Sequence, residues 1–312
     1  MSDGTRGTAG IWHLIGAVAA VTAVWMAGIG LSLDWASALM PGLACLALAA
    51  GAAFYRSVRP DERLAAAMTA TAQLVAFTAV AGPLSYAVAG SGGPLWDATF
   101  LSWDRALGLD WRAYLAFVDA HPRLGFVFTL AYQSLLPQML LAVTVLGFSG
   151  RFTACREFVM ALILAALASI AVSGITPAMA MFVQLGLDPQ ADFPNLDPAA
   201  AFVHVADLKS LRAGTFRVVS LRHLEGIITF PSFHAALGVI FARAFWASRW
   251  TRWPGLALNG VLIAATPIDG GHYFVDLIAG AAIAALAIAA ARRLCGGVPS
   301  VAPVPVPAGV AP

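Results

Sequence analysis

Two short stretches decide how this chain folds: Phe230-Pro231-Ser232-Phe233-His234 and Gly270-Gly271-His272-Tyr273-Phe274-Val275-Asp276. Each opens a long apolar segment and places a histidine at its first helical turn, where a helix leaves the surface of a membrane. In the second stretch, Asp276 follows His272 by four residues and therefore lies on the same helical face. Ionisable groups at the mouths of membrane helices are costly to keep, which marks these positions as functional.

The composition around these stretches is that of an integral membrane protein. Hydrophobic residues make up 60% of the 312 residues, charged residues make up 11%, and the mean hydropathy is +0.81. A soluble domain contains about a quarter charged residues. The net charge of +2 does not indicate binding to nucleic acid. The three cysteines show neither the spacing of metal ligands nor that of a disulfide framework.

A window of about 20 apolar residues per span predicts an all-α membrane helix bundle of about eight spans. Between the third and fourth spans, residues 90–123 mix tryptophans with aspartates, a pattern typical of an interfacial amphipathic segment. Residues 183–230 form one long polar connection, and the tail 297–312 is expected to be disordered. The predicted spans are 10–31, 36–55, 64–89, 124–148, 157–182, 231–249, 254–269 and 272–291.

The basic residues predict which side of the membrane each turn occupies. With eight spans both termini share one side, and that side holds ten of the 18 basic residues, so we assign it to the cytoplasm. The histidine stretches then lie on the outer side. A second basic group lies there, against the rule, and anion binding is the simplest reason for it. The group consists of Lys209, Arg212, Arg217 and Arg222.

The residues of the two stretches suit phosphoryl transfer. With Pro231 in the first helical turn, free N–H groups of Ser232 and Phe233 and the Ser232 hydroxyl would form an anion site. Asp276 would orient the imidazole of His272, leaving its other nitrogen free to attack. His234 would protonate the leaving alkoxide and then deprotonate the acceptor. The outer basic residues would neutralise the developing charge.

These two stretches resemble motifs of the type 2 phosphatidic acid phosphatase superfamily, which includes lipid phosphate phosphatases and vanadium haloperoxidases. The first is similar to the family's P-S-x-H motif, and the second to its histidine with an aspartate four residues on. The resemblance covers about residues 205–291, and the ordered pair of motifs carries it. It implies that His234, His272 and Asp276 are catalytic and that Ser232 and the outer basic residues bind phosphate.

Two departures from the family pattern favour one branch of it. The arginine that usually stands six residues before the nucleophilic histidine is Thr266 here, and the residue seven after Lys209 is Phe216 rather than arginine. Both resemble the inositol phosphorylceramide synthase branch, which transfers a phospho-head group between lipids. Asp269 would cap the last helix or touch an acceptor hydroxyl. Thr266 and Tyr273 are further candidates beside the site.

We therefore expect a membrane lipid phosphatase or phosphotransferase acting on a phospholipid or isoprenoid phosphate through a phosphohistidine, with no cofactor and no metal. Plain phosphatidate or isoprenyl-diphosphate phosphatase activity stays open, as does a polytopic lipid transporter. The protein is expected in the plasma (inner) membrane, with its site on the periplasmic side and both termini cytoplasmic. The expected parts are 1–123 (spans and interfacial segment), 124–296 (catalytic bundle) and 297–312 (tail).

Overall fold

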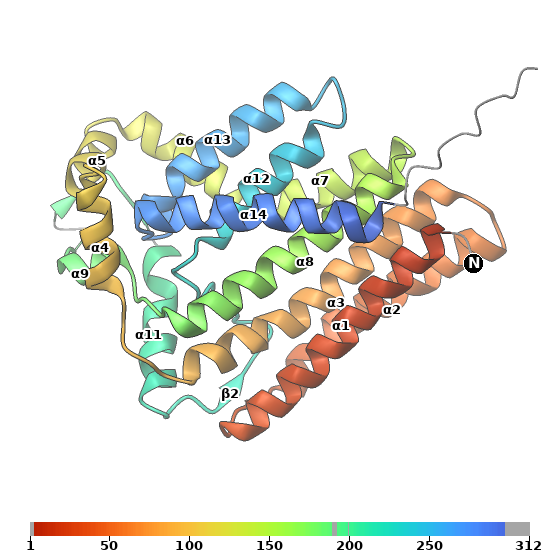
Figure 1. Ribbon diagram of the computed structural model, residues 1–312, viewed down its shortest axis with the longest axis horizontal. Coiled ribbons are helices and arrows are strands. Elements are labelled where there is room, and N and C mark those ends of the chain that lie inside the picture. Colours follow the sequence, from red (N-terminus) through yellow and green to blue (C-terminus); the bar gives the residue numbers. More distant parts are fainter. Residues whose placement is uncertain (1–2, 189–191, 199, 297–312) are drawn as a thin grey trace, which may run out of the picture.

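A computed structural model describes residues 3–188, 192–198 and 200–296, and within them the fold is all-α, as the sequence predicted. The predicted tail 297–312 lies outside the described residues. Long helices run side by side along the bundle, and short helices gather across one end (Figure 1). The long helices are α1 (Asp3–Gly28), α2 (Trp35–Ser57), α3 (Glu62–Gly90), α8 (Phe152–Ile175) and α14 (Phe274–Cys295).

Five of these helices are long and apolar enough to cross a membrane, and a bent pair makes a sixth. The pair consists of α6 (Pro122–Gln133) and α7 (Leu135–Phe148), which meet at 53°. Pro137 explains the break, because it has no N–H for the carbonyl of Gln133 and its ring crowds that carbonyl. The sixth and seventh predicted spans, 231–249 and 254–269, correspond to the shorter α12 (Phe233–Phe245) and to α13 (Arg252–Asp269). The total of eight spans therefore stays a prediction.

The main core lies between α3 and α8, with α1, α7, α12 and α14 packed around them. Phe77 of α3, Ile163 of α8 and Phe241 of α12 are almost completely buried in it. By contrast, α2 exposes large apolar side chains such as Met40 (69%) and Leu46 (68%). Exposing so large an apolar face to water is unfavourable, whereas contact with lipid chains is not, so this face fits a membrane-embedded helix.

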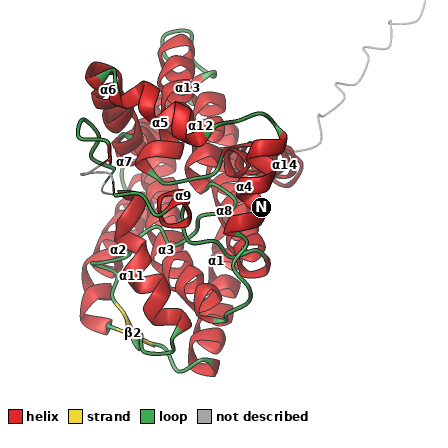
Figure 2. Ribbon diagram, turned by 90° about the vertical axis from the view of Figure 1, so that its left-hand side faces the viewer, coloured by secondary structure: helices red, strands yellow, loops and turns green. Residues whose placement is uncertain are grey.

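The short helices form a second layer over the end of the bundle at which α14 begins (Figure 2). They include α4 (Asp97–Ala106), α5 (Trp111–Asp119), α9 (Met181–Leu185) and α11 (Ala200–Arg212). Phe100, Trp111, Phe182 and Tyr273 fill the core beneath them. A two-residue parallel pairing of β1 (Ser32–Leu33) with β2 (Val218–Val219) ties the polar connection to the start of α2. The predicted amphipathic segment thus forms α4 and α5, which cover the start of α14 and which we call the roof helices.

Candidate active site

The two histidine stretches meet where α12 and α14 begin. The backbone N–H of Ser232 donates to the carbonyl of Asp276 at 3.1 Å, so the first turns of the two helices are bonded directly. Gly280 makes this approach possible, because a Cβ there would collide with the backbone oxygen of Ser232. Two stretches whose histidines are 38 residues apart in the sequence are therefore in direct backbone contact.

His272 and Asp276 form a buried pair. Nδ1 of His272 lies 3.1 Å from Oδ2 of Asp276, and their side chains are 4% and 0% exposed. The same oxygen accepts the backbone N–H of Tyr273 at 2.9 Å, which fixes the carboxylate. Burial lowers the pKa of His272 to about 4, while the backbone carbonyl of Thr229 opposes that shift. The imidazole is therefore neutral at physiological pH, the form that acts as a nucleophile.

His234 lies beside this pair and borders a cavity. The centroids of the two histidine rings are 6.4 Å apart, and the ring of His234 stacks on Tyr132 at 4.4 Å with an interplanar angle of 8°. A cavity of about 260 Å³ is lined by His234, Tyr132, Asp269 and, toward the α6–α7 break, by Leu136. His234 thus lies beside the His272–Asp276 pair and also lines space that a substrate could fill.

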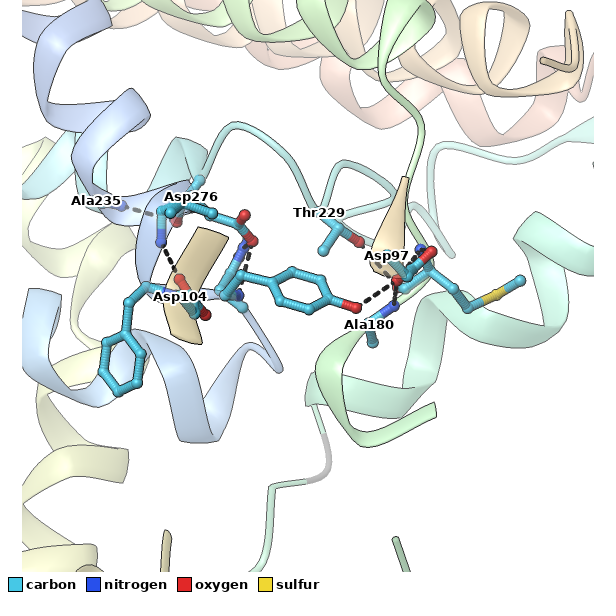
Figure 3. Close-up of polar contacts among 12 residues, drawn as sticks. Asp97, Asp104, Ala180, Thr229, Ala235 and Asp276 are labelled. Carbon is cyan, nitrogen blue, oxygen red and sulfur yellow. Dashed lines mark hydrogen bonds and ion pairs between the residues drawn. The ribbon is translucent and has the colours of Figure 1, made fainter. Parts of the chain in front are cut away.

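Two aspartates of the amphipathic segment, Asp97 and Asp104, bond residues at the start of α14; both are labelled in Figure 3. The Asp104 carboxylate accepts the N–H groups of Phe274 and Val275, each at 2.9 Å, and so caps α14. Burial raises the pKa of Asp104, and those two N–H donors oppose the rise. The positive end of the α14 dipole therefore interacts with the Asp104 carboxylate.

The second of these aspartates, Asp97, connects α4 to the residue that follows His272. Its carboxylate accepts the Tyr273 hydroxyl at 2.7 Å and the backbone N–H groups of Met179 and Ala180. The indole of Trp111 on α5 adds a hydrogen bond to the carbonyl of His272 at 3.2 Å. Helices α4 and α5 therefore hold the carbonyl of His272 and the residues that directly follow it.

The structure corrects the predicted anion site at the start of α12. Pro231 precedes the helix instead of entering its first turn, because Ser232 is the N-cap and its hydroxyl accepts the N–H of Ala235 at 3.3 Å. The N–H of Ser232 is used by Asp276, so it does not face a ligand. Within the described chain, Phe233 and His234 keep backbone N–H groups without a backbone partner. The free N–H groups at the start of α12 are thus those of Phe233 and His234, one residue further along than the expected pair.

The structure also places the outer basic residues away from the histidines. Arg212 donates to the carbonyl of Gly93 at 2.6 Å, Arg222 lies 3.4 Å from the carbonyl of Ala36, and Arg217 lies beside Gly30. Lys209 is in the last turn of α11. Among the described residues, the linings of the cavities next to His234 contain none of these four side chains.

The three further candidates take separate positions. Asp269 does not cap α14; it accepts the Thr129 hydroxyl at 2.9 Å and lines the His234 cavity. Thr266 is fully buried and donates to the carbonyl of Leu262 in its own helix at 2.8 Å. Tyr273 is buried as the N-cap of α14. Of the three, Asp269 is the one whose side chain borders the cavity.

Sequence reasoning missed Asp97, Asp104 and Tyr132. The available signal was weak: Asp97 and Asp104 lie seven residues apart, two turns of one amphipathic helix, and so share a face. That face meets the start of α14, about 170 residues further along the chain. In the described part of the chain, no group of three or more His, Cys, Asp or Glu residues is placed to hold a metal ion.

Comparison with known proteins agrees with this geometry. A family model described as the PAP2 superfamily matches residues 98–290, which include the roof helices and both histidine stretches. No curated protein and no solved structure matches the chain. The family match covers more than half of the chain and supports a membrane enzyme of the phosphatase type whose substrates are lipid phosphates. The chain therefore belongs to the PAP2 superfamily, that of the type 2 phosphatidic acid phosphatases.

Proposed function

We propose that this protein is a membrane lipid phosphatase or phosphotransferase that forms a phosphohistidine on His272. The observation that carries the proposal is the buried contact between Nδ1 of His272 and Asp276 at 3.1 Å, with His234 beside it at the cavity. Asp276 orients the ring, and Nε2 of His272 attacks phosphorus. As the P–N bond forms, the P–O bond to the leaving alcohol breaks, and His234 gives its proton to the departing oxygen.

The second half-reaction reverses these roles. Water or an alcohol gives its proton to His234, the new P–O bond forms, and the electron pair of the P–N bond returns to His272. The N–H groups of Phe233 and His234, which have no backbone partner, would donate hydrogen bonds to the phosphoryl oxygens and stabilise their negative charge. We keep the outer basic residues as proposed phosphate ligands, although their side chains do not line the His234 cavity in the described residues; they are Lys209, Arg212, Arg217 and Arg222.

Within the superfamily we propose the inositol phosphorylceramide synthase-like branch. Two features support it: the last motif reads H-Y-x-x-D, and the position of the missing arginine is filled by Thr266, which is buried in its own helix. Plain phosphatidate or isoprenyl-diphosphate phosphatase is the alternative within the superfamily. The alternative outside the enzymes is a lipid transporter. Transport would not require a histidine oriented by an aspartate, so the His272–Asp276 pair favours an enzyme.

We also propose the orientation and the organisation of the chain. The α2–α3 and α7–α8 turns, which carry Arg59 and Arg151, and the end of α14 lie together at the end of the bundle opposite α4 and α5 (Figure 1). This supports cytoplasmic termini and a site on the outer side of the plasma membrane. We retain 1–123 and 124–296 as the two membrane parts, with α4 completing the site of the second.

The proposal is tested with the purified protein and its His272→Ala variant. Each is given phosphatidate, an isoprenyl diphosphate, and a mixture of ceramide with phosphatidylinositol. We expect turnover by the wild-type protein and a loss of at least a thousandfold in the variant. Product identity separates hydrolysis from transfer, and equal turnover by both proteins would rule out the covalent mechanism.

A further inference from the structure

Tyr132 on α6 is a buried tyrosine whose hydroxyl has no partner within the described residues. It is 8% exposed, and no group in the described parts of the chain forms a hydrogen bond with it. The two other buried tyrosines of the described chain both use the hydroxyl: Tyr86 donates to Asp207 at 2.8 Å, and Tyr273 donates to Asp97 at 2.7 Å. A phenol hydroxyl inside a protein normally has a partner, so an unpartnered one indicates a ligand.

The hydroxyl of Tyr132 lies near the edge of the His272 imidazole. Both groups approach Gly270 so closely that a Cβ there would lie 2.8 Å from the Tyr132 oxygen and 2.7 Å from Cδ2 of His272. Cδ2 is bonded to Nε2, the nitrogen that attacks phosphorus in the proposed mechanism. Because Gly270 has no side chain, the hydroxyl can come close to the nucleophile.

The ring of Tyr132 is held by the other catalytic histidine. It stacks on the ring of His234, with centroids 4.4 Å apart and an interplanar angle of 8°, and both side chains line the cavity of about 260 Å³. The face of the phenol ring is thus used by His234, while the hydroxyl at its edge remains available for a hydrogen bond. Tyr132 therefore lies next to the proposed acid and the proposed nucleophile.

A phosphoryl group in this place would meet no cation of the cavity. Among the described residues, the lining of the His234 cavity contains no lysine or arginine, and it includes the carboxylates of Asp197 and Asp269. The phosphoryl oxygens then depend on neutral donors such as the backbone N–H groups of Phe233 and His234. Negative charge on these oxygens must be stabilised during transfer, so each preorganised donor contributes to the rate. A phenol keeps its proton at neutral pH, which makes Tyr132 a further donor.

We infer that Tyr132 is a catalytic residue whose hydroxyl donates a hydrogen bond to a nonbridging oxygen of the phosphoryl group during its transfer to and from His272. This rests on the proposed function, because it needs phosphorus between His234 and Nε2 of His272. The phenol keeps its proton throughout. The P–N bond to His272 forms as the P–O bond breaks, and the leaving alcohol still takes its proton from His234. The hydrogen bond is strongest in the transition state, so it raises kcat more than it tightens lipid binding.

The substitution Tyr132→Phe tests this role, because it keeps the ring that stacks on His234 and removes only the hydroxyl. Single-turnover formation of the phosphoprotein is measured by rapid quench at saturating lipid, together with steady-state KM and the thermal midpoint. Loss of one preorganised donor to an oxyanion lowers the rate about 100-fold. We expect that loss in Tyr132→Phe with little change in KM. The thermal midpoint should stay unchanged, because the hydroxyl has no partner among the described residues to lose. Inhibition by orthovanadate, which imitates five-coordinate phosphorus, should weaken with the rate.

The matched control is Tyr86→Phe, which removes a buried hydroxyl on α3 that bonds Asp207 and the backbone N–H of Glu225. It should lower the thermal midpoint and keep the wild-type rate of phosphoprotein formation. A wild-type rate in Tyr132→Phe overturns the role of its hydroxyl and leaves the proposed function standing. Equal slowing in Tyr86→Phe, or an equal fall of the midpoint in Tyr132→Phe, does the same, because the effect would then be structural. Absence of a phosphoprotein from the wild type overturns the proposed function and the role of Tyr132 with it.

Discussion

Asp104 provides the sharpest prediction, because its carboxylate accepts two backbone N–H groups at the start of α14. In Asp104→Asn, the amide oxygen satisfies one N–H, while the amide nitrogen faces the other. A charge-assisted hydrogen bond is lost within the protein interior, which costs about 2 kcal/mol. If the loss misplaces His272 and raises the activation free energy of attack by the same amount, the rate of attack falls by about 30-fold.

The assay separates placement from stability. Rapid-quench measurement follows formation of the acid-labile phosphoprotein with the lipid that the protein turns over fastest, and a thermal midpoint is recorded for each variant. Asp61→Asn is the matched control, because Asp61 likewise caps a helix by accepting two backbone N–H groups, those of Arg63 and Leu64. It lies at the start of α3, away from the histidines.

We expect both substitutions to lower the thermal midpoint and only Asp104→Asn to slow formation of the phosphoprotein. A folded Asp104→Asn protein that forms it at the wild-type rate would refute the role of the clamp. Equal slowing in Asp61→Asn would also refute it, because the effect would then reflect general destabilisation.

Three further predictions follow from the same geometry. Burial holds the pKa of His272 at about 4, so this nucleophile stays neutral as the pH is lowered from 7 to 5, while protonation of the acid His234 can only increase. The rate of phosphoprotein formation should therefore not fall before about pH 4. An ordinary imidazole would be only about 3% neutral at pH 5, and a 30-fold loss by pH 5 would contradict the burial. Gly270→Ala should lower kcat at least tenfold, because the new Cβ would lie 2.7 Å from Cδ2 of His272. The control is Gly260→Ala in the preceding helix α13, where a Cβ has nothing within 4 Å, and it should match the wild type. Gln138→Leu removes the hydrogen bond from Asn259 at 2.8 Å and should lower the free energy of unfolding by about 1 kcal/mol, whereas an unchanged midpoint in chemical denaturation would show that the bond contributes nothing.

The sequence predicted those features that depend on local periodicity. Apolar segments of span length identify helices wherever they fold, so the all-α bundle was predictable. The four-residue spacing of His272 and Asp276 fixes a shared helical face, and the structure shows that contact. Pro137 also carried a local signal for the bend between α6 and α7, although the single predicted span 124–148 did not use it.

Features that depend on how distant helices dock were not predictable. The Asp104 carboxylate reaches α14 only because Phe100 of the same helix packs on Tyr273, and no local pattern encodes that docking. Ser232 shows the same limit: its N–H was expected to face a ligand, but the packing of α12 against Gly280 directs it to Asp276. The outer basic residues were grouped by sidedness alone, which does not fix their distance from a site.

The most direct test of the account is to identify the residue that becomes phosphorylated. The wild-type protein is incubated briefly with ³²P-labelled phosphatidylinositol or phosphatidate, quenched in alkali to preserve phosphohistidine, and mapped by mass spectrometry. The account predicts an alkali-stable, acid-labile label on His272 that is absent from His272→Ala. Label on another residue, or full turnover by His272→Ala, would contradict it.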